Sequence, residues 1–340
     1  RFQGKDLLLK FLDRSLRPAG GEKENDGRLI DKVYFFINSH RRVKADPASD
    51  DLIGLLRHTT ARLFKADRHF KRLALRGAQN DSPSEIGWFE FVNQVSNQAL
   101  INFANHAMNH LVGGNVFNIF HTIGSAGGLY GMLAPYFIAF SLFSKDREFS
   151  HTVREHFGLP SRVKDRAADA VCVGHFTDTF YDTNGVALTL QQQVRVALRH
   201  DKPLQVITCN EDPHHSQTGV KAFKPIGTYS LPEYQDQTLY YPPLMEMLRY
   251  CYEQGFTRIH SATPGPIGLA ALAIARILKL PICGTYHTQL PQYAQFLTGD
   301  DAMAELTWKF VIWYYDQMDL IYAPSEDTRQ ELIERGIKGD

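Results

Sequence analysis

From about residue 168 onward, short apolar runs rich in β-branched residues alternate with longer segments of helical periodicity. The short runs predict strands at residues 170–174, 204–209, 258–262, 282–286 and 320–323. The longer segments predict helices at residues 186–200, 244–254, 267–280, 302–315 and 326–335. This alternation is typical of a parallel sheet with crossover helices, so residues 166–340 are expected to form an α/β, Rossmann-like domain.

The first half of the chain follows a different pattern. It has few strand-like alternations, and apolar residues such as Leu52, Leu55 and Leu63 recur at helical spacing. We therefore expect residues 1–165 to form a mostly α-helical accessory region of unknown role. A charge run at residues 145–148 and the Gly158-Leu159-Pro160 segment precede the boundary.

A long stretch of the first half carries no charge. Residues 91–144 hold no Asp, Glu, Lys or Arg for 54 positions. A spanning helix needs about 20 predominantly apolar residues, whereas this stretch is interrupted by Asn115, His121, the Gly127-Gly128 pair and Pro135. The pattern leaves open a membrane segment, a buried helical core or a subunit interface. Residues 111–144 are the candidate for peripheral membrane contact.

Overall charge narrows the class of partner. Lys plus Arg and Asp plus Glu both number 37, so no global positive field favours nucleic acid, and no nucleic-acid partner is expected. Four cysteines without CxxC spacing are typical of reduced cytoplasmic thiols. Because the chain begins at Arg1 and stops just past a helical pattern, we expect it to be a fragment of a longer protein.

The loops at the carboxyl ends of the predicted strands are the first candidates for chemistry, because open α/β sheets bind ligands there. After the first strand, Asn184-Gly185-Val186 leads into a helix. A glycine at a helix start lets a diphosphate approach unpaired amides at the positive end of the helix dipole. Asn-Gly is equally an ordinary turn, so the pattern alone leaves both interpretations open.

Three further strands end in distinctive residues. Thr263 and Gly265 lie in a stiff turn with two prolines after the third strand. His287 follows the fourth strand, among neutral hydrogen-bonding groups, where it is either structural or part of a substrate site. After the fifth strand, Ser325 or Glu326 could cap the next helix.

His106 and His110 are four residues apart and would share one face of a helix, with His121 following. Two such histidines could ligate zinc. The charge-free stretch offers no carboxylate ligand, and Asn102, Asn105 and Asn109 indicate a polar helix face. Hydrogen-bonded core histidines are the favoured interpretation, and no metal site is predicted.

The four carboxyl-end segments, taken in order, resemble the N-terminal domain of family 4 retaining glycosyltransferases, the two-Rossmann-domain (GT-B) type that includes mannosyltransferases and sulfolipid-synthase-like enzymes. The resemblance covers roughly residues 168–340. The segments that carry it are Thr177-Asp178-Thr179-Phe180 with Asn184-Gly185-Val186, Ala262-Thr263-Pro264-Gly265-Pro266-Ile267-Gly268, Gly284-Thr285-Tyr286-His287-Thr288 and Ala323-Pro324-Ser325-Glu326.

This resemblance implies roles for individual residues. Asn184, Gly185 and Val186 would lie against the donor diphosphate, and His287 would help position the transferred sugar or the acceptor. Asp178, Thr179, Thr263 and Gly265 would face the acceptor side, with Ser325 and Glu326 further along the same edge.

The same resemblance implies a hexosyltransferase-type reaction. A sugar would pass from a nucleotide-diphosphate sugar to a lipid or carbohydrate acceptor with retention at the anomeric carbon, without a cofactor or required metal. The protein would act in the cytoplasm, or at the inner face of the membrane. The family's second Rossmann domain, which supplies most donor contacts, has no counterpart in this sequence, so the fragment alone is expected to be inactive.

Two other interpretations stay open at this point. One is a non-catalytic interaction or membrane-docking module with a degenerate transferase domain, in which the charge-free stretch binds the partner. The other is a hydrolase or phosphatase module upstream of Arg1, fused to a transferase region.

Overall fold

The computed structural model describes residues 85–112, 171–212, 217–231, 234–299 and 301–338. It also describes short pieces at 59–63, 65–68, 70, 72, 133–134, 136–141, 153 and 156–158. The chain divides into two compact units, residues 1–139 and 140–340. Each unit is described by itself. The boundary expected near residue 165 lies outside the described residues.

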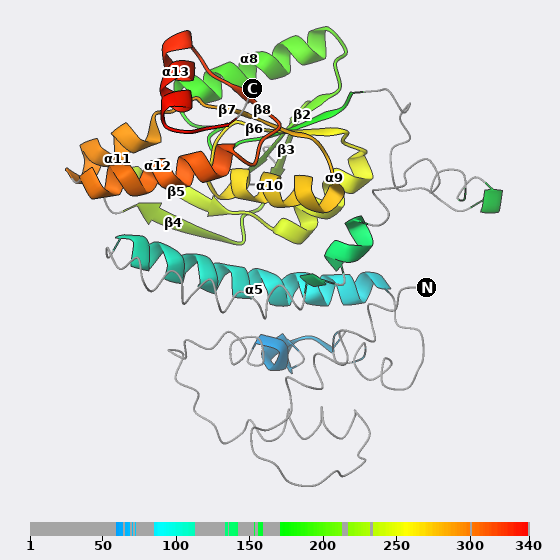
Figure 1. The fold of residues 1–340 in the computed structure, drawn as a ribbon. Helices are drawn as coiled ribbons and strands as arrows, with labels where there is room; N and C mark the ends of the chain where they lie inside the picture. Colours follow the sequence, from blue (N-terminus) through cyan, green and yellow to red (C-terminus); the bar gives the residue numbers. More distant parts are fainter. Residues whose placement is uncertain are drawn as a thin grey trace. The chain divides into compact units, whose positions relative to one another are not determined.

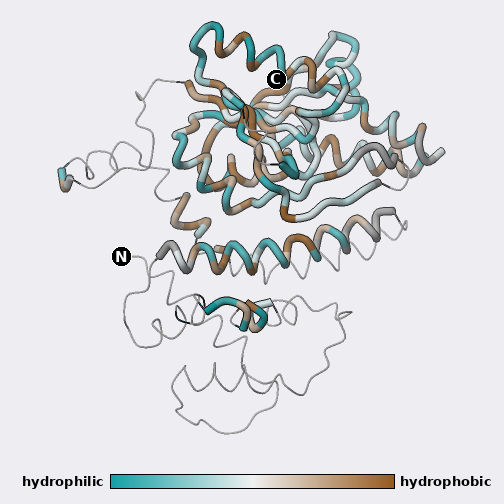
Figure 2. Tube along the Cα trace, turned by 180° about the vertical axis from the view of Figure 1, so that it is seen from behind, coloured by the Kyte–Doolittle hydropathy of each residue, from teal (hydrophilic) through white to brown (hydrophobic). Residues whose placement is uncertain are grey.

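The first unit is built around the 28-residue helix α5 (Glu85–Val112). Its buried residues Phe91, Val92, Val95 and Ala99 recur at helical spacing, and hydrophobic and hydrophilic positions alternate along it (Figure 2). The Phe91 ring packs edge-on against Phe70, with ring centroids 5.6 Å apart. The helical character expected for this region is therefore confirmed where the structure describes it.

Several predictions for the first half fall outside the description. His106 and His110 lie within α5, but their side chains are outside the described part, as is the whole of His121. Most of residues 111–144 lies there too. Among the helices that the structure describes, none is both long and apolar enough to cross a membrane.

The second unit contains a six-stranded parallel sheet. Its strands are β1 (Val173–Phe176), β2 (Leu204–Cys209), β3 (Val220–Phe223), β6 (Arg258–Ser261), β7 (Ile282–Thr285) and β8 (Leu320–Tyr322). They lie in the order β3-β2-β1-β6-β7-β8, and every neighbouring pair is parallel. The strand order reverses between β1 and β6, which is the position where doubly wound folds bind ligands.

Helices cover both faces of the sheet (Figure 1). On one side lie α8 (Gly185–Arg199) and α13 (Glu326–Glu334). On the other lie α9 (Leu244–Gln254), α10 (Pro266–Leu278) and α12 (Asp301–Tyr315), with the short α11 (Leu290–Thr298) beside α12. The Rossmann-like α/β fold predicted from the sequence is thereby confirmed.

A hydrophobic cluster fixes α8 on the sheet. Leu190 and Val194 of α8 pack with Val206, Val220 and Phe180, and both Leu190 and Val206 are fully buried. Figure 2 shows the same arrangement as hydrophobic strands at the centre of this unit and hydrophilic loops around them. Burying a side chain of this size contributes about 1.5–3 kcal/mol, so the start of α8 has a rigid support.

Some elements differ from the predicted ones. The first strand runs over Val173–Phe176 rather than 170–174. The edge strand β3, the helix α11 and the antiparallel hairpin of β4 (Gly227–Leu231) and β5 (Tyr234–Tyr241) were not predicted. All four cysteines are free and buried, as expected of reduced thiols.

Candidate functional site

Four predicted segments meet at one edge of the sheet. Asp178, Thr263, His287 and Ser325 follow β1, β6, β7 and β8 respectively, and these strands are consecutive neighbours in the sheet. Because all four strands are parallel, their carboxyl ends lie at the same edge. We call this edge the carboxyl rim. It consists of the loops that follow these four strands, of which the first begins at residue 177 after β1 and the last ends at residue 326 at the start of α13.

Asp178 and Thr263 join the first two segments of the rim. The Thr263 hydroxyl donates to Oδ2 of Asp178 over 2.6 Å, and the backbone N–H of Asp178 donates to Oγ1 of Thr263 over 2.9 Å. The other carboxylate oxygen, Oδ1, accepts from the backbone N–H of Ile267 at 2.8 Å, in the first turn of α10. Asp178 therefore caps α10, whose own N-cap residue Gly265 has no side chain to do so.

Burial and hydrogen bonding shift the pKa of Asp178 in opposite directions. Burial raises the pKa of Asp178 to about 6, although hydrogen bonds from the Thr263 side chain and from the Ile267, Gly268 and Gly265 backbone favour its charged form. Both carboxylate oxygens are engaged with α10 and its loop. Asp178 thus holds the β6–α10 turn in place through both carboxylate oxygens.

Glycine is required at two positions here, one in the turn before α10 and one in the first turn of the helix. A Cβ at Gly265 would lie 2.6 Å from the Asp178 carboxylate, and one at Gly268 would lie 1.9 Å from the backbone oxygen of Thr263. Real Cβ atoms do not approach this closely, so the packing of Asp178 against α10 depends on both glycines. Gly265 thus lies next to Asp178 and Thr263, and local packing explains this arrangement.

Thr179 follows Asp178 in the loop after β1, but its environment differs. It is 8% exposed, and its hydroxyl is buried without a hydrogen-bond partner among the residues that the structure describes. Its backbone N–H donates to Oγ1 of Thr177 over 3.2 Å. The loop after β1 therefore contains one buried hydroxyl without a hydrogen-bond partner among the described residues.

The start of α8 is open. The Asn184 side chain caps the helix by accepting from the Ala187 N–H at 2.9 Å. No acidic residue occupies the first turn, and a Cβ at Gly185 would meet no atom within 4 Å among the described residues. Val186 is half-buried beside them. Unpaired amides at an unobstructed helix start favour an anion.

His287 follows β7 and is half-buried, and its Nε2 atom is enclosed without a hydrogen-bond partner in the described part of the chain. Burial lowers the pKa of this imidazole below its ordinary value. The side chain is therefore neutral near pH 7, and its Nε2 can donate or accept a hydrogen bond according to the tautomer.

Two further histidines, which the sequence interpretation did not single out, lie behind His287. His175 of β1 is 2% exposed, and its ring centroid is 4.2 Å from that of His260 in β6. Burial lowers the pKa of His175 well below its ordinary value, with His260 and His287 adding to the shift. Burial likewise lowers the pKa of His260 to about 4, again with His287 adding to it. The signal was in the sequence, because polar residues inside buried parallel strands are unusual.

The hairpin also contributes a residue to the rim that the sequence interpretation missed. Tyr240 of β5 has a raised pKa, first because of burial and then because of the charges of Glu211 and Asp182. These two acids lie in the loops after β2 and β1. No motif marks Tyr240, and only the fold of the hairpin brings it to these loops.

Ser325 and Glu326 have structural partners. The Ser325 hydroxyl accepts from the Thr328 N–H at 3.2 Å and so caps α13. Glu326 pairs with Arg329 at 2.7 Å on an exposed surface. Such an exposed pair contributes at most about 1 kcal/mol.

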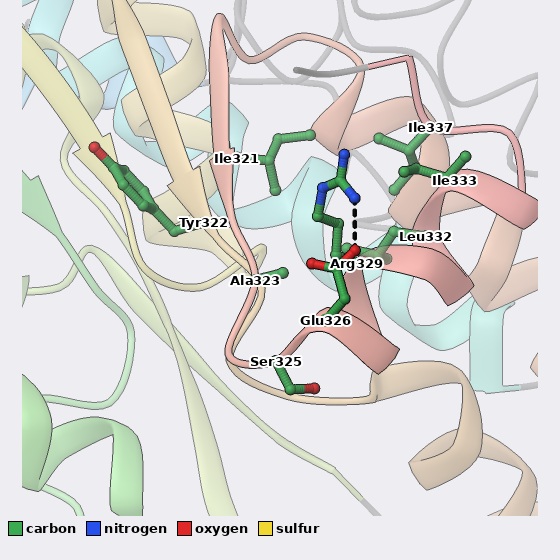
Figure 3. Close-up of a pocket in the computed structure, with 9 residues that line it drawn as sticks. All are labelled: Ile321, Tyr322, Ala323, Ser325, Glu326, Arg329, Leu332, Ile333 and Ile337. Atoms are coloured by element: carbon green, nitrogen blue, oxygen red, sulfur yellow. Dashed lines mark hydrogen bonds and ion pairs between the residues drawn. The ribbon is translucent and has the colours of Figure 1, made fainter.

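A cavity of about 340 Å³ lies between β8 and α13 (Figure 3). The Arg329–Glu326 pair lines it, and five of its other residues are aliphatic. Its lining residues are Ile321, Tyr322, Ala323, Ser325, Glu326, Arg329, Leu332, Ile333 and Ile337. His287 and the start of α8 do not line it, so the cavity is separate from the open groups of the rim.

A metal site finds no support in the described residues, where no group of three or more His, Cys, Asp or Glu side chains is arranged to hold an ion.

Comparison with known proteins gives this rim a context. Residues 183–340 match the family model of Glycosyltransferase Family 4. The alpha-monoglucosyldiacylglycerol synthase of Streptococcus pneumoniae is 23% identical over 168 residues, which are 49% of this chain and 38% of that protein. The sulfoquinovosyl transferase SQD2 of Arabidopsis thaliana is 33% identical over 78 residues, which are 23% of this chain and 15% of that protein.

These matches confirm the resemblance seen in the sequence. The aligned regions span well under half the length of either relative.

Proposed function

We propose, from the premise that residues 183–340 match Glycosyltransferase Family 4, that the complete protein is a retaining glycosyltransferase. It would move a hexose-type sugar from a nucleotide-diphosphate sugar to a membrane lipid. In this proposal the second unit is the acceptor-side Rossmann domain, and a second Rossmann domain supplies most nucleotide contacts.

The observation that carries the proposal is the pairing of two uncommitted groups at one rim. The first turn of α8 carries no acidic residue, and a Cβ at Gly185 would meet no described atom within 4 Å. His287 has an enclosed Nε2 without a partner among the described residues. They follow β1 and β7, which flank β6 in the sheet, so a donor diphosphate and its sugar could span the intervening turn.

The chemistry follows from these groups. The bond between the anomeric carbon and the diphosphate oxygen breaks, and the acceptor hydroxyl oxygen bonds to the same face of that carbon. The hydroxyl proton passes to the leaving diphosphate. Amides at the start of α8 stabilise the negative charge that develops on the diphosphate, while neutral His287 orients the sugar or the acceptor hydroxyl.

Asp178 and Thr263 have a supporting role in this mechanism. Their mutual hydrogen bonds fix the β6–α10 turn between the two open groups. Precise placement of reacting groups supplies a large share of the rate enhancement when no covalent catalyst is used. The proposed acceptor contacts of Thr263 and Gly265 are then made by a turn that is already rigid before substrate binds. Those of Thr179 are made by the loop after β1, which is joined to this turn through Asp178.

A lipid acceptor is preferred over a carbohydrate because of the name of the pneumococcal relative. The name of the pneumococcal relative describes the synthesis of a glucosyl diacylglycerol. The Arabidopsis relative is named as a transferase of a sulfoquinovosyl group. We therefore propose diacylglycerol as the first acceptor to test, with the reaction at the cytoplasmic face of a membrane.

The test is an assay of the complete protein with UDP-, GDP- and ADP-hexoses and diacylglycerol in mixed micelles. Release of nucleoside diphosphate that depends on diacylglycerol, together with an α-linked product from an α-linked donor, is the expected result. Absence of transfer from every donor to lipid or oligosaccharide acceptors would contradict the proposal and favour a non-catalytic binding module.

A further inference from the structure

We infer that His260 and Tyr315 position His287 by holding Thr285, two residues before it, from opposite faces of the sheet. The importance of His287 for transfer rests on the proposed function, whereas the positioning itself rests on contacts alone. Neither residue is part of the resemblance described above, and both act through the end of β7.

The first contact comes from the face that carries the histidines. His260 lies next to His175 in the register of β6 and β1, and the two rings are tilted against each other with centroids 4.2 Å apart. On its other side, His260 stacks on Tyr322 of β8 with an interplanar angle of 8°. Its ring is thus held between aromatic neighbours on both sides.

Held in this way, His260 Nε2 shares a hydrogen bond of 2.8 Å with Oγ1 of Thr285. Because burial lowers the pKa of His260 to about 4, the bond joins two neutral groups throughout the neutral pH range. A neutral imidazole can donate or accept at Nε2 according to its tautomer, and the Thr285 hydroxyl can match either.

The second contact comes from the opposite face. The Tyr315 hydroxyl donates to the backbone oxygen of Thr285 over 3.0 Å. Tyr315 is 2% exposed, and its ring packs edge-on against Tyr286 with centroids 5.6 Å apart. The backbone N–H of Tyr286 donates to the Tyr322 oxygen at 2.9 Å, which extends the β7–β8 pairing by one residue.

These contacts fix both residues that precede His287. Thr285 is held through its hydroxyl and its carbonyl, and Tyr286 through its N–H and its ring. His287 Nε2, by contrast, has no hydrogen-bond partner in the part of the chain that the structure describes. The contacts therefore hold the backbone from which the His287 side chain extends.

The test variant is Thr285→Val, which removes the hydroxyl and keeps the side-chain shape. Tyr315→Phe removes the second contact in the same conservative manner. Thr285→Ser restores a hydroxyl and serves as the rescue. The matched control is Thr257→Val, because Thr257 also holds a strand through its hydroxyl, accepting from the Cys172 N–H at 2.8 Å, but lies before β6 at the amino end of the sheet.

The first readout needs no activity. In the 340-residue chain labelled at the histidine ring carbons, the His287 resonance is assigned by its loss in His287→Gln. We expect Thr285→Val and Tyr315→Phe to shift this resonance, while Thr285→Ser and Thr257→Val leave it in place. An unmoved His287 resonance in both variants, with an unchanged circular dichroism spectrum, would overturn the inference.

The second readout is transfer by the complete protein. Thr285→Val should lower kcat about tenfold or more with the donor KM within about twofold, since positioning acts on the reacting geometry rather than on donor binding. Equal kcat for Thr285→Val and wild type would also overturn the inference. If His287→Gln itself keeps full activity, the proposed function of His287 fails, while the resonance shifts still decide whether His260 and Tyr315 position it.

Discussion

Replacing His260 with glutamine should make the second unit less sensitive to acid. The ordinary pKa of histidine is 6.5, and burial lowers the pKa of His260 in the folded protein to about 4. As the pH falls through this interval, the unfolded chain binds a proton at this histidine and the folded chain does not. Stability contributed by neutral His260 is therefore present above about pH 6.5 and is lost as the pH falls toward 4.

The size of the effect follows from the two pKa values. At pH 5 the difference in proton binding amounts to about 2 kcal/mol of lost stability, compared with a few tenths at pH 7. Asp178 acts in the opposite direction, because burial raises its pKa to about 6 and the folded state then binds the proton first. Its contribution is the same in wild type and variant, so it cancels in the comparison.

The assay is urea unfolding of the 340-residue chain at pH 7 and pH 5, followed by tryptophan fluorescence. Trp308 is 4% exposed and reports on the second unit. We expect His260→Gln to be less stable than wild type at pH 7, since it disturbs the stack with His175, but to lose about 2 kcal/mol less between the two pH values. His200→Gln, at the exposed end of α8, is the control.

A His260→Gln variant that loses as much stability on acidification as wild type and His200→Gln would refute the reasoning. In that case His260 would carry its ordinary pKa in the folded protein, and the neutral pair with Thr285 could not be maintained below about pH 6.

Three further predictions concern the rim. Asp178→Ala should lower the free energy of unfolding by about 1–3 kcal/mol through loss of the cap on α10. The control Asp182→Ala, at an exposed position, should change it by less than about 0.5 kcal/mol. Equal urea unfolding midpoints for the two variants would contradict the capping role. Gly268→Ala should prevent normal folding, because the added Cβ would meet the backbone oxygen of Thr263. Gly185→Val, in open space, should leave the thermal unfolding midpoint within a few degrees of wild type and weaken donor binding measured by calorimetry. Unchanged donor affinity of Gly185→Val would show that the diphosphate binds elsewhere. Transfer should continue in EDTA, because amides rather than a bound ion are proposed to stabilise the leaving diphosphate; activity that EDTA abolishes and Mg²⁺ restores would reject this part of the mechanism.

Much of the α/β domain could be predicted because its strands are short apolar runs. Residues 204–209 were predicted as a strand with the observed bounds, and α9 as a helix with the observed bounds. The strands of a parallel sheet are covered on both faces, so their apolar composition distinguishes them, while α9 is distinguished by its helical periodicity. The carboxyl rim could likewise be predicted, because parallel strands deliver their carboxyl ends to one edge.

The elements that were missed lack this signal. The hairpin strand β5 reads Tyr-Gln-Asp-Gln-Thr-Leu-Tyr-Tyr, without alternating apolar residues. The edge strand β3 has only four residues, and α11 has a proline in its first turn. In these segments tertiary contacts, rather than local pattern, determine the structure.

The roles of single residues depended on register. The contact between Asp178 and Thr263 joins residues 85 positions apart, and the stack of His175 on His260 depends on the pairing of β1 with β6. No spacing in the chain encodes such partners. The sequence could therefore locate the rim, but not distinguish Asp178, which caps a helix, from His287, which keeps a free nitrogen.

The most direct test of the proposed transfer site compares wild type with His287→Ala in the complete protein, using the donor and lipid that give nucleoside diphosphate release. His287→Ala should fold normally and reduce turnover more than tenfold, which corresponds to about 1.4 kcal/mol or more of transition-state stabilisation. Undiminished turnover by a folded His287→Ala protein would contradict the account and assign this histidine to the structure of the rim alone.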